Sequence, residues 1–126
     1  MKTYNINNLV SELKTKCVPV VLFGAQKYGK LALYALNKLD VKVGYFYDDT
    51  VQDETYLNIP IISPNKLANM DKDSHIFICT GYAINPIVSR LKEMGFENIY
   101  NCVNLFEKTD FSTVNFKDIN IFEIKR

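Results

Sequence analysis

Short runs of apolar residues alternate along the chain with longer segments in which apolar residues recur every three or four positions. Unbroken apolar runs are typical of strands that are buried on both faces of a parallel sheet. Recurrence every three or four positions is typical of helices with one buried face. The apolar runs predict strands at 18–23, 41–47, 59–62, 75–79 and 98–103.

Helices are predicted before the first strand and in the intervals between most of the others. Residues 6–13 carry one apolar stripe, and residues 28–39 carry a second. Serine, threonine or asparagine before a helix caps its start, proline is favoured in the first turn, and glycine often follows the last turn. Residues of this kind that mark the predicted helix ends are Thr3 or Asn5, Ser63-Pro64, Asn85-Pro86 and Gly95.

The alternation of strands and helices defines the predicted fold class. Strand–helix–strand units form parallel sheets with right-handed connections. If the strand at 18–23 is central, the strand order is 3-2-1-4-5, numbered along the chain. The sequence therefore predicts a Rossmann-like α/β fold with three layers, in which helices cover both faces of a parallel sheet of about five strands.

The chain of 126 residues has the length of one domain. We predict a Rossmann-like nucleotide-binding domain with an N-terminal helix at 1–103, followed by a C-terminal tail at 104–126. The tail is too apolar for a disordered end, so it predicts an extra strand or hairpin, or packing on the domain, on a missing catalytic domain or on another subunit. Its apolar residues are Val114, Phe116, Ile119, Ile121, Phe122 and Ile124.

Charge and composition exclude several functional classes. A net charge of +1 without any basic cluster provides no field to attract DNA or RNA. The chain has no signal-peptide pattern and no apolar run near the ~18 residues of a membrane span, which predicts a cytoplasmic protein. Cys17, Cys79 and Cys102 are widely spaced and the only histidine is His75, so neither a disulfide framework nor a metal site is predicted.

A glycine-rich turn after the first strand is the main candidate site. The stretch Gly24-Ala25-Gln26-Lys27-Tyr28-Gly29 follows the dinucleotide fingerprint G-x-G-x-x-G except at the second glycine, where Gln26 stands. The second glycine lets the backbone approach a pyrophosphate, so Gln26 disfavours NAD or FAD in their usual pose. A monophosphate, a nucleotide-sugar or an empty cavity remain open. The P-loop spacing also fails, because Leu31 stands where a magnesium ligand is required.

Two further clusters should lie beside this turn. Asp48 and Asp49 follow the second strand at about the offset of a ribose-binding acid, and they could equally be solvated turn residues. Thr80, Gly81 and Tyr82 follow the fourth strand, where open α/β sheets form a ligand crevice. The candidate ligand-binding residues are Gly24, Gln26, Lys27, Tyr28, Gly29, Asp48, Asp49, Thr80, Gly81 and Tyr82.

No catalytic residues are predicted. His75 begins a strand and so lies away from the carboxyl ends where the crevice forms. Neither a Ser–His–Asp set nor a Cys–His pair can be assembled from the sequence. The chain therefore has no recognisable catalytic group of its own.

As a set, the stretches 20–49, 58–67 and 75–100 resemble the Rossmann-like domain of bacterial proteins that modify sugars for surface polysaccharides. Similar domains precede left-handed β-helix sugar acetyltransferases or are attached to methyltransferases. The resemblance implies a module that helps to hold a nucleotide-sugar, with Gly24, Gly29 and Asp48 in the matching positions. The acetyl-transfer residues of that family lie in the β-helix, which this chain lacks.

The leading hypothesis is a nucleotide- or nucleotide-sugar-binding module of surface-glycan biosynthesis. One alternative is a degenerate Rossmann domain used for protein association or oligomerisation. Another is a small NAD(P)-dependent enzyme. Neither the base nor the sugar of a ligand follows from the sequence.

Overall fold

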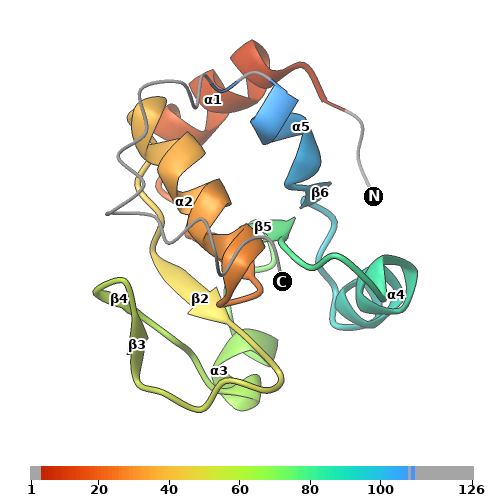
Figure 1. Ribbon diagram of the computed structural model, residues 1–126. Helices are drawn as coiled ribbons and strands as arrows, with labels where there is room; N and C mark the ends of the chain where they lie inside the picture. Colours follow the sequence, from red (N-terminus) through yellow and green to blue (C-terminus); the bar gives the residue numbers. More distant parts are fainter. Residues whose placement is uncertain (1–3, 108, 110–126) are drawn as a thin grey trace.

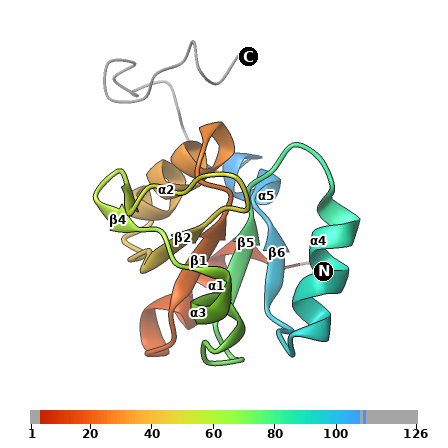
Figure 2. The ribbon, with the colours of Figure 1, turned by 90° about the horizontal axis from the view of Figure 1, so that it is seen from below.

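The computed structural model describes residues 4–107 and 109, and its centre is a parallel sheet of four strands. These strands are β1 (Val20–Phe23), β2 (Tyr45–Tyr47), β5 (His75–Ile78) and β6 (Ile99–Asn101). They lie side by side in the order β2-β1-β5-β6 (Figure 2). All eight residues of β1 and β5 are buried, which explains why both strands read as unbroken apolar runs.

Helices cover both faces of the sheet (Figure 1). One face packs against α1 (Ile6–Thr15), α2 (Lys27–Lys38) and α5 (Val103–Glu107). The other face packs against α3 (Pro64–Ala68) and α4 (Ile84–Glu93). Residues that alternate along β1 belong to opposite layers of the core. The predicted α/β class with helices on both faces is thus confirmed.

The third predicted strand, at 59–62, is not a strand of the main sheet. Its first half forms β4 (Ile59–Pro60), which pairs antiparallel with β3 (Thr55–Tyr56) in a separate hairpin. The tight turn between them has φ values of 52° at Leu57 and 66° at Asn58. The second half of the predicted strand reaches β2 through one isolated parallel bridge, between Ile61 and Phe46. The prediction of five strands in the order 3-2-1-4-5 is therefore corrected to four strands and one bridge.

Proline explains this correction. Pro60 has no N–H group to donate, so it interrupts any ladder that would run through 59–62 along β2. The chain instead pairs 59–60 with the preceding residues, and the Ile62 N–H then donates to the Phe46 carbonyl at 2.9 Å. The prediction placed Pro60 correctly at an edge and overestimated the length of the strand.

Several element ends also differ from the predictions. The second strand begins at Tyr45, because the Val41 N–H closes the end of α2 by donating to the Leu36 carbonyl at 2.9 Å. The last strand ends at Asn101 and is followed by α5, which was not predicted. That helix crosses the predicted domain boundary, and Leu105 within it is fully buried. The tail predictions for 110–126 lie outside the described residues.

Side-chain capping distinguishes α1 and α3 from α2 and α4. The side chain of Asn5 caps α1 and that of Ser63 caps α3, both as predicted. In contrast, α2 begins after Gln26 and α4 begins after Ala83, and neither residue makes a side-chain cap. The predicted cap at Asn85 is wrong, because this residue already lies inside α4.

Candidate functional site

A cavity of about 590 Å³ lies at the carboxyl ends of β1 and β5, where the first turns of α2 and α4 meet. Nine of the ten predicted ligand-binding residues line it, and only Gly29 does not. The walls that the sequence did not predict consist of Phe23, Thr50, Cys79, Ala83, Pro86, Ile87 and Arg90. The three predicted clusters thus converge on one site, as strand ends at a reversal of strand order should.

Gly24 forms the floor of this cavity between the two central strands. Its φ of +128° lies outside the range that other residues adopt readily, and its N–H donates to the Tyr47 carbonyl at 2.7 Å. A Cβ at this position would lie 2.5 Å from the Cys79 carbonyl oxygen. Glycine is therefore required both for the turn and for the close approach of β1 to the end of β5.

Gly29 has a packing role rather than a place in the cavity wall. It lies in the first turn of α2, and a Cβ there would come within 2.0 Å of the Gly24 carbonyl oxygen. The absence of a side chain lets α2 rest directly on the turn that precedes it. This is the role expected of the third glycine in the dinucleotide fingerprint.

Gln26 replaces the second glycine of that fingerprint and lies on the cavity wall. Its carbonyl accepts a hydrogen bond from the Tyr56 hydroxyl at 3.1 Å, and its side-chain amide lies 3.4 Å from the Thr50 hydroxyl. Its side chain makes no cap hydrogen bond to α2, so it does not satisfy the N–H groups of the first turn. Compared with glycine, Gln26 therefore adds a side chain to the cavity wall without capping the helix.

Asp48 joins the glycine turn to the loop after β2. One carboxylate oxygen accepts from the Ala25 N–H at 2.8 Å. The other accepts from the Thr50 N–H and hydroxyl, both at 2.8 Å, and from the Val51 N–H at 3.2 Å. Partial burial alone would raise the pKa of this carboxyl, but these hydrogen bonds outweigh burial and hold its pKa below the usual value. Hydrogen bonds within the protein therefore occupy most of the lone pairs with which the Asp48 carboxylate could accept hydrogen bonds from ribose hydroxyls.

Replacing Asp48 by asparagine should destabilise the fold by about 1 kcal/mol at pH 7, since a carboxylate that accepts several hydrogen bonds is lost. The folded pKa lies below the unfolded value of about 3.9, so the ionised carboxylate stabilises the fold above that pH. This contribution disappears as the pH falls through the folded pKa. Urea unfolding of both proteins between pH 7 and pH 3 measures the effect, and the difference should shrink toward acid pH.

The control for this variant is Asp53→Asn, which removes an exposed carboxylate from the same loop. Its effect should stay within about 0.5 kcal/mol. A difference between Asp48→Asn and the parent protein that is as large at pH 3 as at pH 7 would contradict the role given to the ionised carboxylate.

Asp49 pairs with Arg90 across the cavity wall. The two guanidinium nitrogens Nη1 and Nη2 donate to the two carboxylate oxygens at 3.1 and 3.0 Å, and the Tyr47 hydroxyl donates to Oδ1 at 2.6 Å. Burial, followed by the hydrogen bond to Asp49, raises the pKa of Tyr47 to about 12. Arg90 also lies over the Phe23 ring, 5.2 Å from its centroid. These contacts hold a planar cation in a defined orientation at the site.

Sequence reasoning did not find Arg90, and it had no local signal to do so. The residue lies in the middle of α4, 41 positions from its partner Asp49. One sequence feature could have indicated Arg90. It lies four residues after Pro86 and three after Ile87, which is the spacing of one helix face, and both of these residues also line the cavity.

The loop after β5 forms the opposite rim. The Thr80 hydroxyl donates to the Tyr82 carbonyl at 2.7 Å, and Ala83 follows with a left-handed φ of 57°. Gly81 lies against the Tyr28 ring, so that a Cβ would come within 3.0 Å of it. The Tyr82 side chain is 74% exposed. The rim therefore presents an aromatic ring and the uncapped start of α4 on the same side.

Other candidate groups lie away from this cavity. His75 is fully buried at the start of β5, and its Nδ1 lies 3.0 Å from the Tyr100 hydroxyl. The part of the chain that the structure describes contains no group of three or more residues suited to hold a metal ion. Within the same residues, no helix has both the length and the apolar character needed to cross a bilayer.

Comparison with known proteins adds no assignment. The chain matches no protein-family model, and no curated protein is significantly similar to it. Its class is therefore defined by its own architecture, which is a parallel α/β domain with a cavity at the strand-order reversal.

Proposed function

We propose that the cavity binds the phosphate groups of a nucleotide or nucleotide-sugar, and that the chain is a ligand-binding module without a catalytic step of its own. The residues that would contact the ligand come from the first turns of α2 and α4 and from the loops after β1, β2 and β5. The resemblance of the sequence to domains of sugar-modifying proteins is the support for assigning this module to bacterial surface-glycan biosynthesis. That assignment is part of the proposal.

The contrast in helix capping is the observation that carries the proposal. Three helices start away from the cavity: α1 and α3 have side-chain caps, and the Val103 N–H at the start of α5 donates to Asn101 Oδ1 at 3.0 Å. In contrast, α2 and α4 start at the cavity wall without side-chain caps. An uncapped helix start presents free N–H groups and a partial positive charge, which together favour an anion. Two such starts at one cavity suit a phosphate or diphosphate, with more of the N–H donors in α2 than in α4, because Pro86 in the first turn of α4 has no N–H.

Size and charge support the same ligand class. A volume of about 590 Å³ lies within the roughly 300–1,000 Å³ of typical small-molecule sites. The wall carries two cations, Lys27 and Arg90, and two carboxylates, Asp48 and Asp49. Asp49 pairs with Arg90 and orients it. The exposed Tyr82 ring offers a surface on which a base or sugar can stack. The Asp48 carboxylate already accepts hydrogen bonds from the loops after β1 and β2, so ribose recognition through that carboxylate is not part of the proposal.

Titration calorimetry with UDP-, GDP- and CDP-sugars tests the proposal. We expect at least one of them to bind with a dissociation constant below about 1 mM, which corresponds to roughly 4 kcal/mol. Lys27→Glu should weaken that binding about tenfold or more, because it reverses a charge beside the phosphate. The matched control is Lys14→Glu, which makes the same change in charge at the exposed end of α1.

Two results would contradict the proposal. One is the absence of detectable heat with all three classes of nucleotide-sugar at millimolar concentration. The other is an equal loss of affinity in the Lys27→Glu and Lys14→Glu variants, since this would show a general effect of charge rather than a contact in the cavity.

A further inference from the structure

Two buried cysteines lie side by side at the carboxyl ends of β5 and β6. The register of these parallel strands pairs Ile78 with Asn101, and the Cys102 N–H extends the ladder by donating to the Ile78 carbonyl at 3.1 Å. Cys79 and Cys102 are therefore the next pair in the register. Both belong to the same layer of the core, so their side chains lie on the same face of the sheet. No local pattern indicates this pair, because the two residues are distant in the chain.

The placement of this cysteine pair suits a disulfide bond. Neighbouring strands lie about 4.8 Å apart. A disulfide requires Cα atoms separated by roughly 4.4–6.8 Å and side chains that point the same way. Both thiols are free in the structure. The third cysteine, Cys17, is exposed and precedes β1 at the opposite end of the sheet, so it cannot bridge to either of them.

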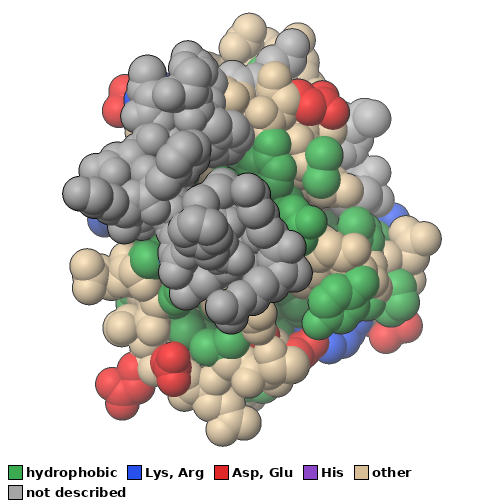
Figure 3. Space-filling view, viewed as in Figure 1, with side chains coloured by type: hydrophobic (Ala, Val, Ile, Leu, Met, Phe, Trp, Pro, Cys, Tyr) green, Lys and Arg blue, Asp and Glu red, His purple; other side chains and the backbone are tan. Residues whose placement is uncertain are grey.

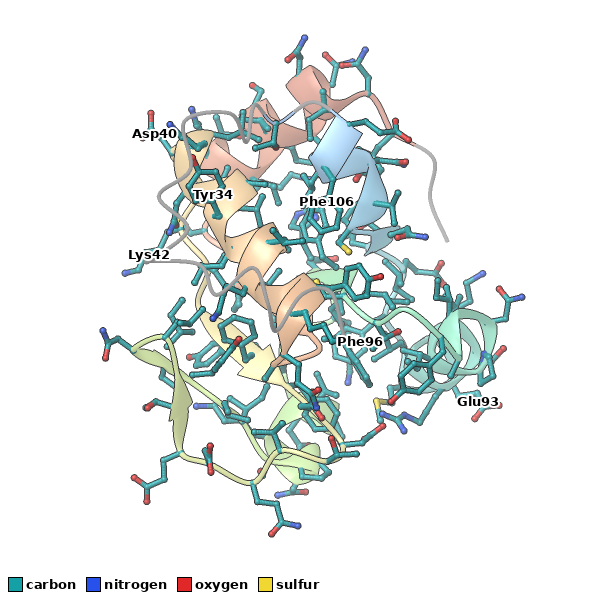
Figure 4. All side chains as sticks on the ribbon, in the orientation of Figure 1. Tyr34, Asp40, Lys42, Glu93, Phe96 and Phe106 are labelled. Atoms are coloured by element: carbon teal, nitrogen blue, oxygen red, sulfur yellow. The ribbon has the colours of Figure 1, made fainter. Side chains whose placement is uncertain are left out.

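The cavity gives access to one thiol of the pair. Cys79 lines the cavity, whereas Cys102 is buried outside its lining, and α5 begins directly after it. On this side of the sheet, Phe106 points from α5 toward α2 and packs against the same core layer (Figure 4). Hydrophobic side chains gather near the middle of the described surface on this side (Figure 3). A small reagent that enters the cavity therefore meets Cys79 first.

We propose that Cys79 and Cys102 form a reversible disulfide when hydrogen peroxide enters the cavity. In the first step, the Cys79 thiolate attacks one oxygen of the peroxide. An S–O bond forms, the O–O bond breaks, and the leaving hydroxide takes up the proton that the thiol released. The products of this step are a sulfenic acid on Cys79 and one water molecule.

The second step closes the disulfide. The Cys102 thiolate attacks the sulfur of the sulfenic acid, an S–S bond forms and the S–O bond breaks. The leaving hydroxide takes up the proton of Cys102 and becomes the second water molecule. The two thiols together lose two electrons, and the peroxide is reduced to two water molecules. A small thiol in solution reverses the change by thiol–disulfide exchange.

Burial controls the rate of the first step. It raises the pKa of the Cys79 thiol, and the neighbouring Cys102 raises this pKa further. The thiolate is the nucleophile, so Cys79 reacts more slowly than an exposed thiol at the same pH. The second step is fast by comparison, because Cys102 is held beside the sulfur that it attacks. The site therefore responds to sustained exposure to peroxide, and the sulfenic acid does not accumulate.

Mass spectrometry after peroxide treatment tests the proposal. The protein used is the full chain with Cys17→Ser, which removes the exposed thiol and leaves the pair unchanged. It is treated with hydrogen peroxide, and the remaining thiols are then alkylated in denaturant. We expect a loss of about 2 Da, no alkylated cysteine and complete reversal by dithiothreitol. Peptide mapping should find Cys79 linked to Cys102 within one chain.

Two results of this measurement would overturn the proposal. One is a protein in which both thiols are still alkylated, after a treatment that fully oxidises Cys17 in the natural chain. The other is a disulfide that links two chains instead of Cys79 and Cys102 of one chain. Neither result depends on a substitution in the core, so the measurement decides the proposal even if a core variant does not fold.

Single-thiol variants in the Cys17→Ser protein test the route through the cavity. With Cys102→Ser, the Cys79 thiol should form a sulfenic acid that dimedone traps. With the matched variant Cys79→Ser, the Cys102 thiol should react about tenfold more slowly or less, because the cavity does not reach it. Circular dichroism checks that both variants are folded. Equal rates for the two thiols in folded variants would show that oxidation follows unfolding, and this would overturn the route.

Protection by a ligand separates this inference from the proposed function. A nucleotide-sugar in the cavity should slow the oxidation of Cys79, and this expectation alone rests on the proposed function. A disulfide that forms at the same rate with and without UDP-, GDP- and CDP-sugars would support the cysteine pair and count against ligand binding in the cavity. Binding detected by calorimetry without any disulfide after peroxide treatment would support the ligand site and overturn the inference about the pair.

Discussion

Replacing Gly29 by alanine should destabilise the protein by about 3 kcal/mol, the upper end of the usual cost of overpacking. The new Cβ would lie 2.0 Å from the Gly24 carbonyl oxygen and 3.0 Å from Cε1 of Phe46. The carbonyl belongs to the backbone of the turn, so the contact can be relieved only by moving α2 away from β1. Alanine is the better helix former by about 1 kcal/mol, and this gain is too small to offset the clash.

Urea unfolding followed by circular dichroism measures this change. The control is Gly44→Ala, because a Cβ at Gly44 would lie 3.7 Å from the Val20 carbonyl oxygen, an ordinary contact. Gly44 is also outside the left-handed region, so its replacement should be neutral or slightly stabilising. A Gly29→Ala protein as stable as the Gly44→Ala protein would show that α2 does not rest on the Gly24 turn.

Gly24→Ala should be at least as severe, because two costs combine at this position. An alanine at a φ of +128° is strained, and its Cβ would lie 2.5 Å from the Cys79 carbonyl oxygen. Together these costs amount to about 3 kcal/mol or more. For a domain of this size, that corresponds to a fall in the midpoint of thermal unfolding of about 10 °C or more.

Gly95→Ala separates the two costs. Gly95 follows α4 with a φ of +102°, and the nearest atom to an added Cβ is a flexible lysine carbon at 3.5 Å. This variant therefore carries backbone strain without a clash, and it should lose only about 1–2 kcal/mol. If Gly24→Ala and Gly95→Ala lower the midpoint equally, the close approach of β1 to Cys79 contributes nothing to the requirement for glycine.

The parts of the fold that the sequence predicted correctly depend on local pattern. The buried strands β1 and β5 appear as unbroken apolar runs, because every side chain in them faces one of the two core layers. The predicted strand at 59–62 was wrong because the local pattern of these residues is compatible with two different strand pairings. The same four residues could extend along β2 or fold back into a hairpin, and the choice depends on the turn at Leu57 and Asn58.

At the candidate site, too, the sequence predicts local features correctly and does not predict contacts between distant residues. Glycine turns and strand ends are local features, and the topology of a parallel α/β sheet brings them together, so nearly all the predicted residues line the cavity. The role of each acidic residue depends on its neighbours in space. Asp48 could be placed at the site from the sequence, but the hydrogen bond that it accepts from the Ala25 N–H could not be predicted.

The sequence by itself therefore determined the α/β class, the glycine turn after the first strand and the set of loops that meet at the cavity. It did so because burial and backbone preference leave periodic, local traces in a chain. Only the tertiary structure decided that Asp48 is committed to the loops, that Arg90 joins the site through Asp49 and that α2 and α4 both start uncapped at one cavity. These are contacts between residues distant in sequence, and no local pattern specifies which distant groups will meet.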